Sequence, residues 1–345
     1  MEKKHVLMLP FPTQGHIKPM LCLAELLCHT GLHVTFVNTH HNHRRLNNLK
    51  DLSTRYPTLC FESISDGLPY DHPRDSQHLK ELIKSIQNVT KSHFRDLLRS
   101  HQSHEALSPP VSCVITDGIM SFSIDAAEEL RMEVIVFRTF TASCLWTYFC
   151  IPKLIEEGEI PFPDNDMDKL LTCIPGMENV LRRRDLPRVC RSEKVDNPLI
   201  QFFICETLAM PRVFALIINT FDGLEGPMIT KLGSFFSTIY TIGPLHALLS
   251  SIIKDSPPLA STNSLLWKED RDCMSWLDSQ PLKLVVFVSF GSLVQLTLPE
   301  VLEFCHGLIN SGNKFLWVIR SDPITGEDDL SEILQEFEDK SEGIG

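Results

Sequence analysis

The 345-residue sequence predicts an α/β fold with one complete parallel sheet and the beginning of a second. Short apolar runs alternate with helical patterns through residues 1–245, which is typical of a doubly wound, Rossmann-like domain. A stretch rich in serine and proline at 246–272 then interrupts the pattern and indicates a linker. The alternation resumes within 273–345. This length is short of the ~100–150 residues of a compact domain, so we expect only part of a second one.

The first strand–helix–strand unit follows most directly from the residues. His5–Leu9 is an apolar run that predicts a strand, and a loop should follow it as far as Gly15. From Ile17 to His29 apolar residues recur at helical spacing, and Gly31 should end the helix. A second strand is expected at His33–Val37. A helix between two strands of one sheet implies that the strands are parallel.

The same alternation predicts the remaining elements. In the first domain, strands are expected at Val111–Thr116, Glu133–Phe137, Phe214–Asn219 and Thr238–Ile242, and helices at Ser123–Arg131 and Ala142–Ile151. In the second domain, strands are expected at Leu284–Phe290 and Lys314–Ile319, and a helix at about Leu330–Phe337. Thr297 and Glu300 have the spacing of a capping box, which predicts the start of a further helix that Gly312 should end.

Composition excludes several classes of protein. A formal net charge of −12 disfavours binding to nucleic acid phosphates and to anionic membranes. The 11 cysteines are odd in number and form no C-x-x-C pair, so neither a zinc site nor a disulfide framework is indicated. The apolar run Val6–Leu9 is too short for a signal peptide, and no stretch reaches the ~18–20 apolar residues of a membrane span. We expect a cytoplasmic protein without a membrane span.

One candidate for chemistry is a histidine at the start of the first helix. The helix dipole disfavours a cation there, so we expect His16 to be neutral and able to accept a proton. Asp117 follows another strand and could lie beside it at the same edge of the sheet, fixing the imidazole tautomer. The alternatives are a histidine that only caps a turn and an aspartate that only shapes the turn before Gly118. Because no Gly-x-Ser-x-Gly elbow occurs, the pair would deprotonate a substrate hydroxyl.

Three other patterns are less specific. Gly291 and Ser292 follow the first strand of the second domain and could bind phosphate oxygens through backbone N–H groups, although an ordinary turn also explains them. Asp164–Asp166 has the D-x-D form of some metal sites, but we interpret it as a solvated acidic loop. The histidines of His40–His43 could bind a metal, but a polar loop that opens a helix explains them more simply. We therefore predict no metal site.

Taken together, the residues resemble the plant family 1 UDP-glycosyltransferases over the whole chain. The matching blocks are Pro10–Met20, Asp117–Gly118, Arg184–Pro187, Asn219–Glu225, Ile242–Leu245, Cys273–Asp278 and Val286–Ser292. The first block, together with Phe61–Pro69, is most similar to the branch that glucosylates iridoid aglucones such as 7-deoxyloganetin.

The resemblance implies a GT-B fold, with an acceptor-binding domain at 1–245 and a nucleotide-sugar-binding domain beginning at 273. It implies inverting transfer of glucose from UDP-glucose to a small apolar acceptor, without a metal or a resident cofactor, by a monomer. His16 would be the base and Asp117 its partner. The other implied contacts are Gly15, Thr141 and Ser143 with the substrates, and Gly291 and Ser292 with the donor.

One departure from the family is equally informative. The family's donor signature runs from Trp-Ala-Pro-Gln through His-Cys-Gly-Trp-Asn-Ser to Asp-Gln, and these 345 residues contain none of it. We therefore expect the chain as given to lack most of the donor site and to be inactive alone. An alternative is a non-catalytic binder in which Phe140, Trp146, Phe149, Phe202 and Phe203 hold an apolar aglycone, although packing in the core also explains most of these residues. A nicotinamide dehydrogenase is disfavoured because the G-x-G-x-x-G fingerprint is absent.

Overall fold

The computed structural model describes residues 4–46, 49–75, 77–102, 109–253, 266, 271–291, 294, 296–318, 324–325 and 337. The chain divides into two compact units, Met1–Tyr70 with Ile83–Leu266 and Asp71–Leu82 with Trp267–Gly345. The boundary at Leu266 lies inside the stretch predicted as a linker. Residues 71–82, which the sequence placed in the first domain, group with the second unit instead.

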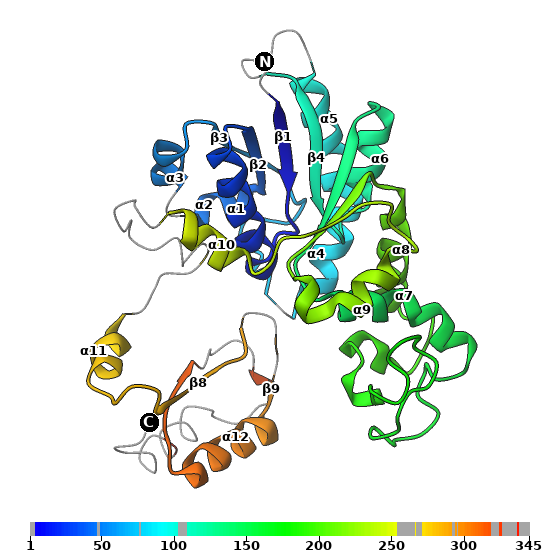
Figure 1. Cartoon of the computed structure of the whole chain (residues 1–345), viewed down its shortest axis with the longest axis vertical. Helices are drawn as coiled ribbons and strands as arrows, with labels where there is room; N and C mark the ends of the chain where they lie inside the picture. Colours follow the sequence, from blue (N-terminus) through cyan, green and yellow to red (C-terminus); the bar gives the residue numbers. More distant parts are fainter. Residues whose placement is uncertain are drawn as a thin grey trace. The chain divides into compact units, whose positions relative to one another are not determined.

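The first unit is built on a seven-stranded sheet in which every neighbouring pair is parallel, in the order β3-β2-β1-β4-β5-β6-β7. The strands are β1 (His5–Leu9), β2 (His33–Thr39), β3 (Leu59–Ile64), β4 (Val111–Asp117), β5 (Glu133–Arg138), β6 (Ala215–Ile218) and β7 (Ile239–Thr241). The order reverses between β1 and β4, which lie side by side (Figure 1). In this architecture ligands bind beyond the carboxyl ends of the strands at such a switch point.

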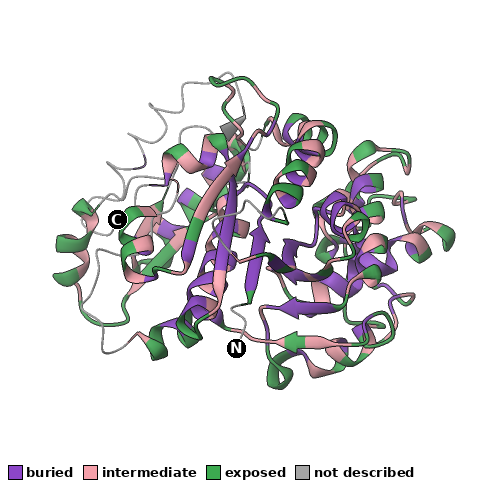
Figure 2. Cartoon of the chain, turned by 90° about the horizontal axis from the view of Figure 1, so that it is seen from above, coloured by how far each residue is buried: buried purple, intermediate pink, exposed green. Residues whose placement is uncertain are grey.

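Helices cover this sheet. They are α1 (Gln14–His29), α2 (His40–Arg45), α3 (Leu49–Arg55), α5 (Lys91–His101), α6 (Phe122–Glu129), α7 (Ala142–Glu156), α8 (Pro198–Ala209), α9 (Asp222–Leu232) and α10 (Leu245–Ile252). Helix α4 (Leu79–Ser85) includes the boundary between the two units, at residues 82 and 83. The central strands β1, β2, β4 and β6 are mostly buried, the edge strands β3 and β7 are less so, and the helices carry exposed residues on their outer faces (Figure 2). In α1, Ile17 and Met20 pack in one core cluster with Val6 and Met8 of β1, which anchors the helix that follows the first strand.

Several elements differ from the sequence prediction. Helix α1 begins at Gln14, not Ile17, so His16 lies inside its first turn. Strand β3 was not predicted, because Cys60, Glu62 and Ser63 interrupt its apolar pattern. The prediction of a linker directly after residue 245 is wrong for its first part, where α10 forms. Leu245 and Leu249, four residues apart on one face of α10, are buried in the main core cluster, and this burial favours a helix.

The second unit contains a strand–helix–strand motif. Strands β8 (Val285–Ser289) and β10 (Lys314–Val318) pair in parallel, and α12 (Leu298–Ser311) connects them. Short strands β9 (Leu296–Thr297) and β11 (Ile324–Thr325) form a second parallel pair, and α11 spans Asp272–Asp278.

The caps predicted for the helix of this motif are confirmed. The Thr297 N–H donates to the Glu300 carboxylate at 2.7 Å in a capping box, and Gly312 ends α12 in the left-handed conformation at φ +63°. Strand β8 is less buried than the strands of the large sheet, since the Phe287 side chain is 66% exposed. The helix predicted at about Leu330–Phe337 lies outside the described residues, apart from Phe337.

Among the residues that the structure describes, no helix is long and apolar enough to cross a membrane.

A buried acid lies within the core-facing surface of α1. Glu25 is 1% exposed, and one of its carboxylate oxygens has no hydrogen-bond partner. Burial raises the pKa of Glu25 to about 7, against smaller opposing effects of the Arg55 charge and a hydrogen bond from Tyr56. The unfolded chain ionises this carboxyl near its ordinary pKa of 4.5, so only the unfolded state gains the charge between these two values.

We expect the free energy of unfolding to fall as pH rises from about 4.5 to 7, because the folded state keeps Glu25 protonated. At ~1.4 kcal/mol per pKa unit the loss is about 3 kcal/mol. Glu25→Gln removes the ionisable group. The variant should therefore have the same free energy of unfolding as the wild type near pH 4.5 and a higher one at pH 8. Urea unfolding across this range measures the difference, with Glu156→Gln on an exposed helix position as the control. Parallel pH profiles of Glu25→Gln and the wild type would contradict the assignment.

Candidate active site

The histidine and the aspartate singled out in the sequence meet at the switch point. His16 lies in the first turn of α1, just beyond the carboxyl end of β1, and Asp117 is the last residue of β4. Because β1 and β4 are parallel neighbours, these two ends lie at one edge of the sheet. His16 Nδ1 and Asp117 Oδ2 are 2.6 Å apart. The histidine side chain is 17% exposed and the aspartate side chain 2%, so the pair is reached from the histidine side.

The contacts of Asp117 fix the imidazole tautomer. A carboxylate only accepts hydrogen bonds, so His16 Nδ1 carries the proton in this contact and Nε2 is left as the acceptor. The second carboxylate oxygen of Asp117 accepts the Ile119 N–H at 3.1 Å, which holds the carboxylate in place. On the other side, the ring of buried Phe11 meets the imidazole edge-on, with centroids 5.3 Å apart. The arrangement leaves Nε2 as the nitrogen through which a neutral imidazole at this edge of the sheet can accept a proton.

The charge of Asp117 is maintained although the group is fully buried. Burial alone would raise its pKa, but the His16 contact, the Arg138 charge and the Ile119 N–H together hold the pKa below its ordinary value of 3.8. Asp117 therefore stays ionised at neutral pH. Its contribution to stability is present above the ordinary carboxyl pKa and is lost as pH falls through the lower folded value.

The start of α7 lies at the carboxyl end of the next strand, β5. Thr141 caps the helix by accepting the Cys144 N–H at 3.1 Å, and its side chain is exposed. Among the described residues no acceptor is seen for the Thr141 hydroxyl proton, which leaves it free to donate. The Ser143 hydroxyl differs, because it donates to Glu225 of α9 at 2.7 Å.

Glu225 closes the α7 terminus and was not predicted as a site residue. Its carboxylate also accepts the N–H groups of Ala142 and Ser143, both at 2.9 Å. The only sequence signal for it was its place in the family block Asn219–Glu225. This acidic cap occupies the positive end of the helix, so the N–H groups it binds are not available to a ligand.

Two glycines of the site have opposite surroundings. A Cβ added to Gly15 would meet no atom within 4 Å, so open space adjoins the backbone next to His16. A Cβ added to Gly118 would lie 2.1 Å from Arg138 Cδ and 3.0 Å from Met210 Sδ. Gly118 is therefore required by the packing of the buried Arg138 side chain and not by a turn conformation.

The donor residues predicted in the second unit are only partly described. Gly291 follows β8 with φ +70°, a left-handed conformation that glycine adopts without strain. Its N–H contacts the Ser289 hydroxyl at 3.4 Å. These features fit the ordinary turn that was the alternative interpretation. Ser292 lies outside the described residues.

The two sequences that resembled metal sites have structural roles. Asp164 pairs with the guanidinium of Arg183, which is fully buried and also pairs with Glu159 at 3.1 Å. The acidic loop thus neutralises a buried charge, which the interpretation as a merely solvated loop had missed. His40–His43 form most of α2, with Thr39 as the N-cap, where the sequence predicted a loop before a helix. No group of side chains suited to a metal occurs among the described residues.

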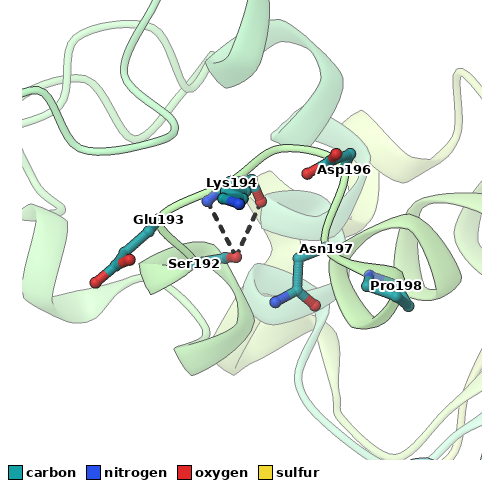
Figure 3. Close-up of a pocket in the computed structure, with 6 residues that line it drawn as sticks. All are labelled: Ser192, Glu193, Lys194, Asp196, Asn197 and Pro198. Carbon is teal, nitrogen blue, oxygen red and sulfur yellow. Dashed lines mark hydrogen bonds between the residues drawn. The ribbon is translucent and has the colours of Figure 1, made fainter.

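A surface hollow lies away from the residues discussed so far. Its lining comes from one stretch of the chain and consists of Ser192–Lys194 and Asp196–Pro198 (Figure 3). Within this stretch the Ser192 hydroxyl donates to the Lys194 carbonyl. None of the predicted site residues lines it. A hollow with this polar lining does not suit an apolar acceptor.

The fold and the pair define an α/β protein with a histidine–carboxylate couple at its ligand-binding edge. Comparison with family models gives no match. The chain is 42% identical to 7-deoxyloganetic acid glucosyltransferase of Catharanthus roseus, covering 99% of this chain and 72% of that protein. It is 46% identical to mogroside I-A1 synthase of Siraitia grosvenorii, over 100% of this chain and 65% of that protein. It is 39% identical to 7-deoxyloganetin glucosyltransferase of Gardenia jasminoides, over 98% of this chain and 72% of that protein. The chain belongs to the plant UDP-glycosyltransferases, and it is a transferase by family.

A solved structure confirms the predicted GT-B fold. UDP-glucose:anthocyanidin 3-O-glucosyltransferase in complex with UDP matches with a TM-score of 0.76 and 23% identity, covering all of this chain and 72% of that one. The family resemblance stated from the sequence is confirmed by the relatives named above, which are 39–46% identical to this chain.

We expect Gly118→Ala to destabilise the protein by about 1–3 kcal/mol, because the new methyl group must displace the buried Arg138 side chain. Gly15→Ala is the matched control: it enters open space in a helical first turn and should change the free energy of unfolding by less than about 0.5 kcal/mol. Thermal and urea unfolding of both variants measure the difference. Equal effects of the two substitutions would contradict the packing described for Gly118.

Proposed function

We propose that this protein transfers glucose from UDP-glucose, with inversion, to a hydroxyl of a small apolar plant metabolite such as an iridoid or flavonoid aglycone. The observation that carries the proposal is the 2.6 Å contact of His16 Nδ1 with Asp117, which leaves Nε2 able to accept a proton at the switch point. The relatives support the chemistry, since all three are glycoside-forming enzymes by name and two act on 7-deoxyloganetic acid and 7-deoxyloganetin.

The proposed reaction is a single displacement. The acceptor oxygen forms a bond to the anomeric carbon of glucose while the bond from that carbon to the UDP oxygen breaks, and UDP leaves with the bonding electrons. His16 Nε2 takes the proton of the acceptor hydroxyl in the same step, a contribution of roughly 10²–10⁴ in rate. Asp117 stabilises the imidazolium that results. Attack on the face opposite the leaving group inverts the configuration.

The proposal assigns further contacts to the other predicted site residues. The open space beside Gly15 admits the acceptor close to the backbone, and the exposed Thr141 hydroxyl can donate to the sugar. Ser143 contributes through the helix terminus that it helps to close, because its own hydroxyl is bonded to Glu225. Gly291 and Ser292 would meet the diphosphate. UDP-glucose is the co-substrate, and no metal or resident cofactor is part of the proposal.

We also propose that the protein acts in the cytoplasm and as a monomer, with the acceptor domain at 1–245 and the donor domain beginning at 273. The eleven cysteines are all free thiols, which suits a reducing compartment. Light scattering during size-exclusion chromatography tests the oligomeric state.

We expect His16→Ala to lower the rate of glucose transfer by about 10²–10⁴, because the variant loses the group proposed to accept the hydroxyl proton. His29→Ala, at the exposed end of the same helix, should leave the rate unchanged. The assay measures glucoside formed from UDP-glucose and a panel of iridoid and flavonoid acceptors. It uses this chain, and beside it a chimera extended by the donor segment of a relative.

Three outcomes are distinguished. Transfer that depends on His16 in either protein supports the proposal. A chimera that forms no glucoside with any acceptor contradicts it. Binding of acceptors without binding of UDP-glucose, measured by calorimetry, would favour the alternative of a non-catalytic aglycone binder.

We expect Asp117→Asn to lower kcat by a factor of up to about 10⁴ while the fold is retained, because an amide can donate to Nδ1 and select the wrong tautomer. Asp96→Asn on the exposed surface of α5 is the control. Steady-state kinetics give kcat, and circular dichroism checks the fold. Wild-type turnover in Asp117→Asn would show that the aspartate only shapes the turn before Gly118.

A further inference from the structure

A buried arginine lies next to the proposed catalytic pair without a hydrogen-bond partner. Arg138 is the last residue of β5 and is 1% exposed. None of its three guanidinium nitrogens has a hydrogen-bond partner, and each is shielded from solvent. A buried guanidinium carries five N–H donors, and leaving them all unpaired is strongly unfavourable. An arrangement of this kind in a native fold calls for a further polar group that accepts from these donors, such as a water, an ion or a ligand.

The surroundings of Arg138 hold its guanidinium in a defined plane. The Phe140 ring lies over it, 3.8 Å from the guanidinium carbon to the ring centroid. The glycine backbone at 118 packs against its side chain. Stacking satisfies the face of the cation but not its N–H groups, which point outward in the guanidinium plane. The unmet requirement is therefore for in-plane acceptor oxygens.

The neighbouring carboxylates do not meet that requirement. The two oxygens of Asp117 are bonded to His16 and to the Ile119 N–H. The two oxygens of Glu206 accept the Ser121 N–H at 2.7 Å and the Ser121 hydroxyl at 2.9 Å. Both groups interact with Arg138 through charge, and neither hydrogen-bonds to it.

We propose that Arg138 is an acceptor-binding residue that takes a carboxylate carried by the acceptor, so that the preferred acceptors are hydroxy acids. The inference rests on the proposed glucose transfer and specifies its acceptor class. A carboxylate offers two coplanar oxygens that match the guanidinium fork. Arg138 and His16 both interact with Asp117, so a bound carboxylate lies near the base that receives the hydroxyl proton.

Aromatic side chains that would contact the apolar part of such an acceptor lie beside the guanidinium. Phe140, which is only partly buried, is followed by Tyr148 and Phe203 in a row of rings with centroids 5.8 Å and 5.2 Å apart. This aromatic row begins at the ring that stacks on the guanidinium. The site therefore takes a compact hydrophobic skeleton that carries both a hydroxyl and a carboxylate.

The test compares hydroxy acids with their methyl esters, which keep the shape but lose the charge. The probes are 4-hydroxybenzoate, 4-hydroxycinnamate and 4-hydroxycyclohexanecarboxylate, each paired with its ester. Dissociation constants are measured by calorimetry on this chain, and transfer to the same pairs is measured on the chimera. We expect at least one acid to bind 10-fold or more tightly than its ester, because only the acid pairs with the guanidinium.

Four variants complete the design. Arg138→Gln should weaken binding of the acid at least 10-fold and of the ester less than 2-fold, and Arg138→Lys should keep part of the preference, since it retains the charge without the fork. Arg138→Met should fold at least as stably as the wild type, because it removes an unpaired buried charge. Arg188→Gln replaces an exposed arginine and should leave the dissociation constants of both the acid and the ester unchanged.

Two results would overturn the proposal. The first is a wild type that binds no acid of the panel more tightly than its ester. The second is an Arg138→Gln variant that affects acid and ester equally, which would make Arg138 a positioning residue that acts through Asp117. Failure of glucose transfer is a separate outcome, because the preference for acids is read from binding alone.

Discussion

The arrangement of the candidate site depends on one short hydrogen bond between two strand ends. His16 and Asp117 are 101 residues apart in the chain, and the reversal of strand order between β1 and β4 brings them within 2.6 Å. The contact requires an ionised carboxylate inside the protein. It is kept ionised by the imidazole, by a backbone N–H and by the charge of Arg138, which together outweigh the effect of burial on its pKa. Without these neighbours burial would raise the pKa of a carboxyl at this position.

The buried carboxylates around this edge of the sheet all accept hydrogen bonds from neighbouring groups. Glu225 closes the first turn of α7, and Glu206 binds the Ser121 backbone and hydroxyl. Each of these carboxylates has its oxygens bonded to N–H or hydroxyl donors. The guanidinium of Arg138 is the exception among these groups, because its nitrogens have none. In the described part of the chain, this edge thus combines fixed negative groups, which orient the base and the helix, with the Arg138 cation, which we propose binds the acceptor carboxylate.

The sequence predicts the parts of this arrangement that depend on local pattern. Strand β1 has the predicted bounds, and the apolar spacing of α1 places it after that strand. The pairing of His16 with Asp117 follows from the rule that parallel strands end at a common edge. The capping box and the final glycine of α12 are equally local, because they involve residues only a few positions apart.

What the sequence does not show depends on contacts between distant residues. Helix α10 is stabilised by burial in the core of the first unit, and a polar segment follows it, so the pattern suggested a linker. The role of Glu225 requires α9 to lie against the start of α7. Arg138 is a charged residue at the end of an otherwise largely apolar strand. No other feature of the local sequence indicated that a buried cation would lie near Asp117. Asp164 likewise needs its distant partner Arg183 before it can be understood.

The central claim is that His16 presents an unprotonated Nε2 because Asp117 holds the proton on Nδ1. Nitrogen-15 NMR of protein labelled at histidine, recorded at neutral pH, distinguishes the two ring nitrogens directly. His16→Ala identifies the signals, and Asp117→Asn shows their dependence on the carboxylate. We predict a protonated Nδ1 and an unprotonated Nε2 in the wild type, with this preference lost in Asp117→Asn. A wild-type protein with the proton on Nε2, or a tautomer that does not respond to Asp117→Asn, would contradict the account.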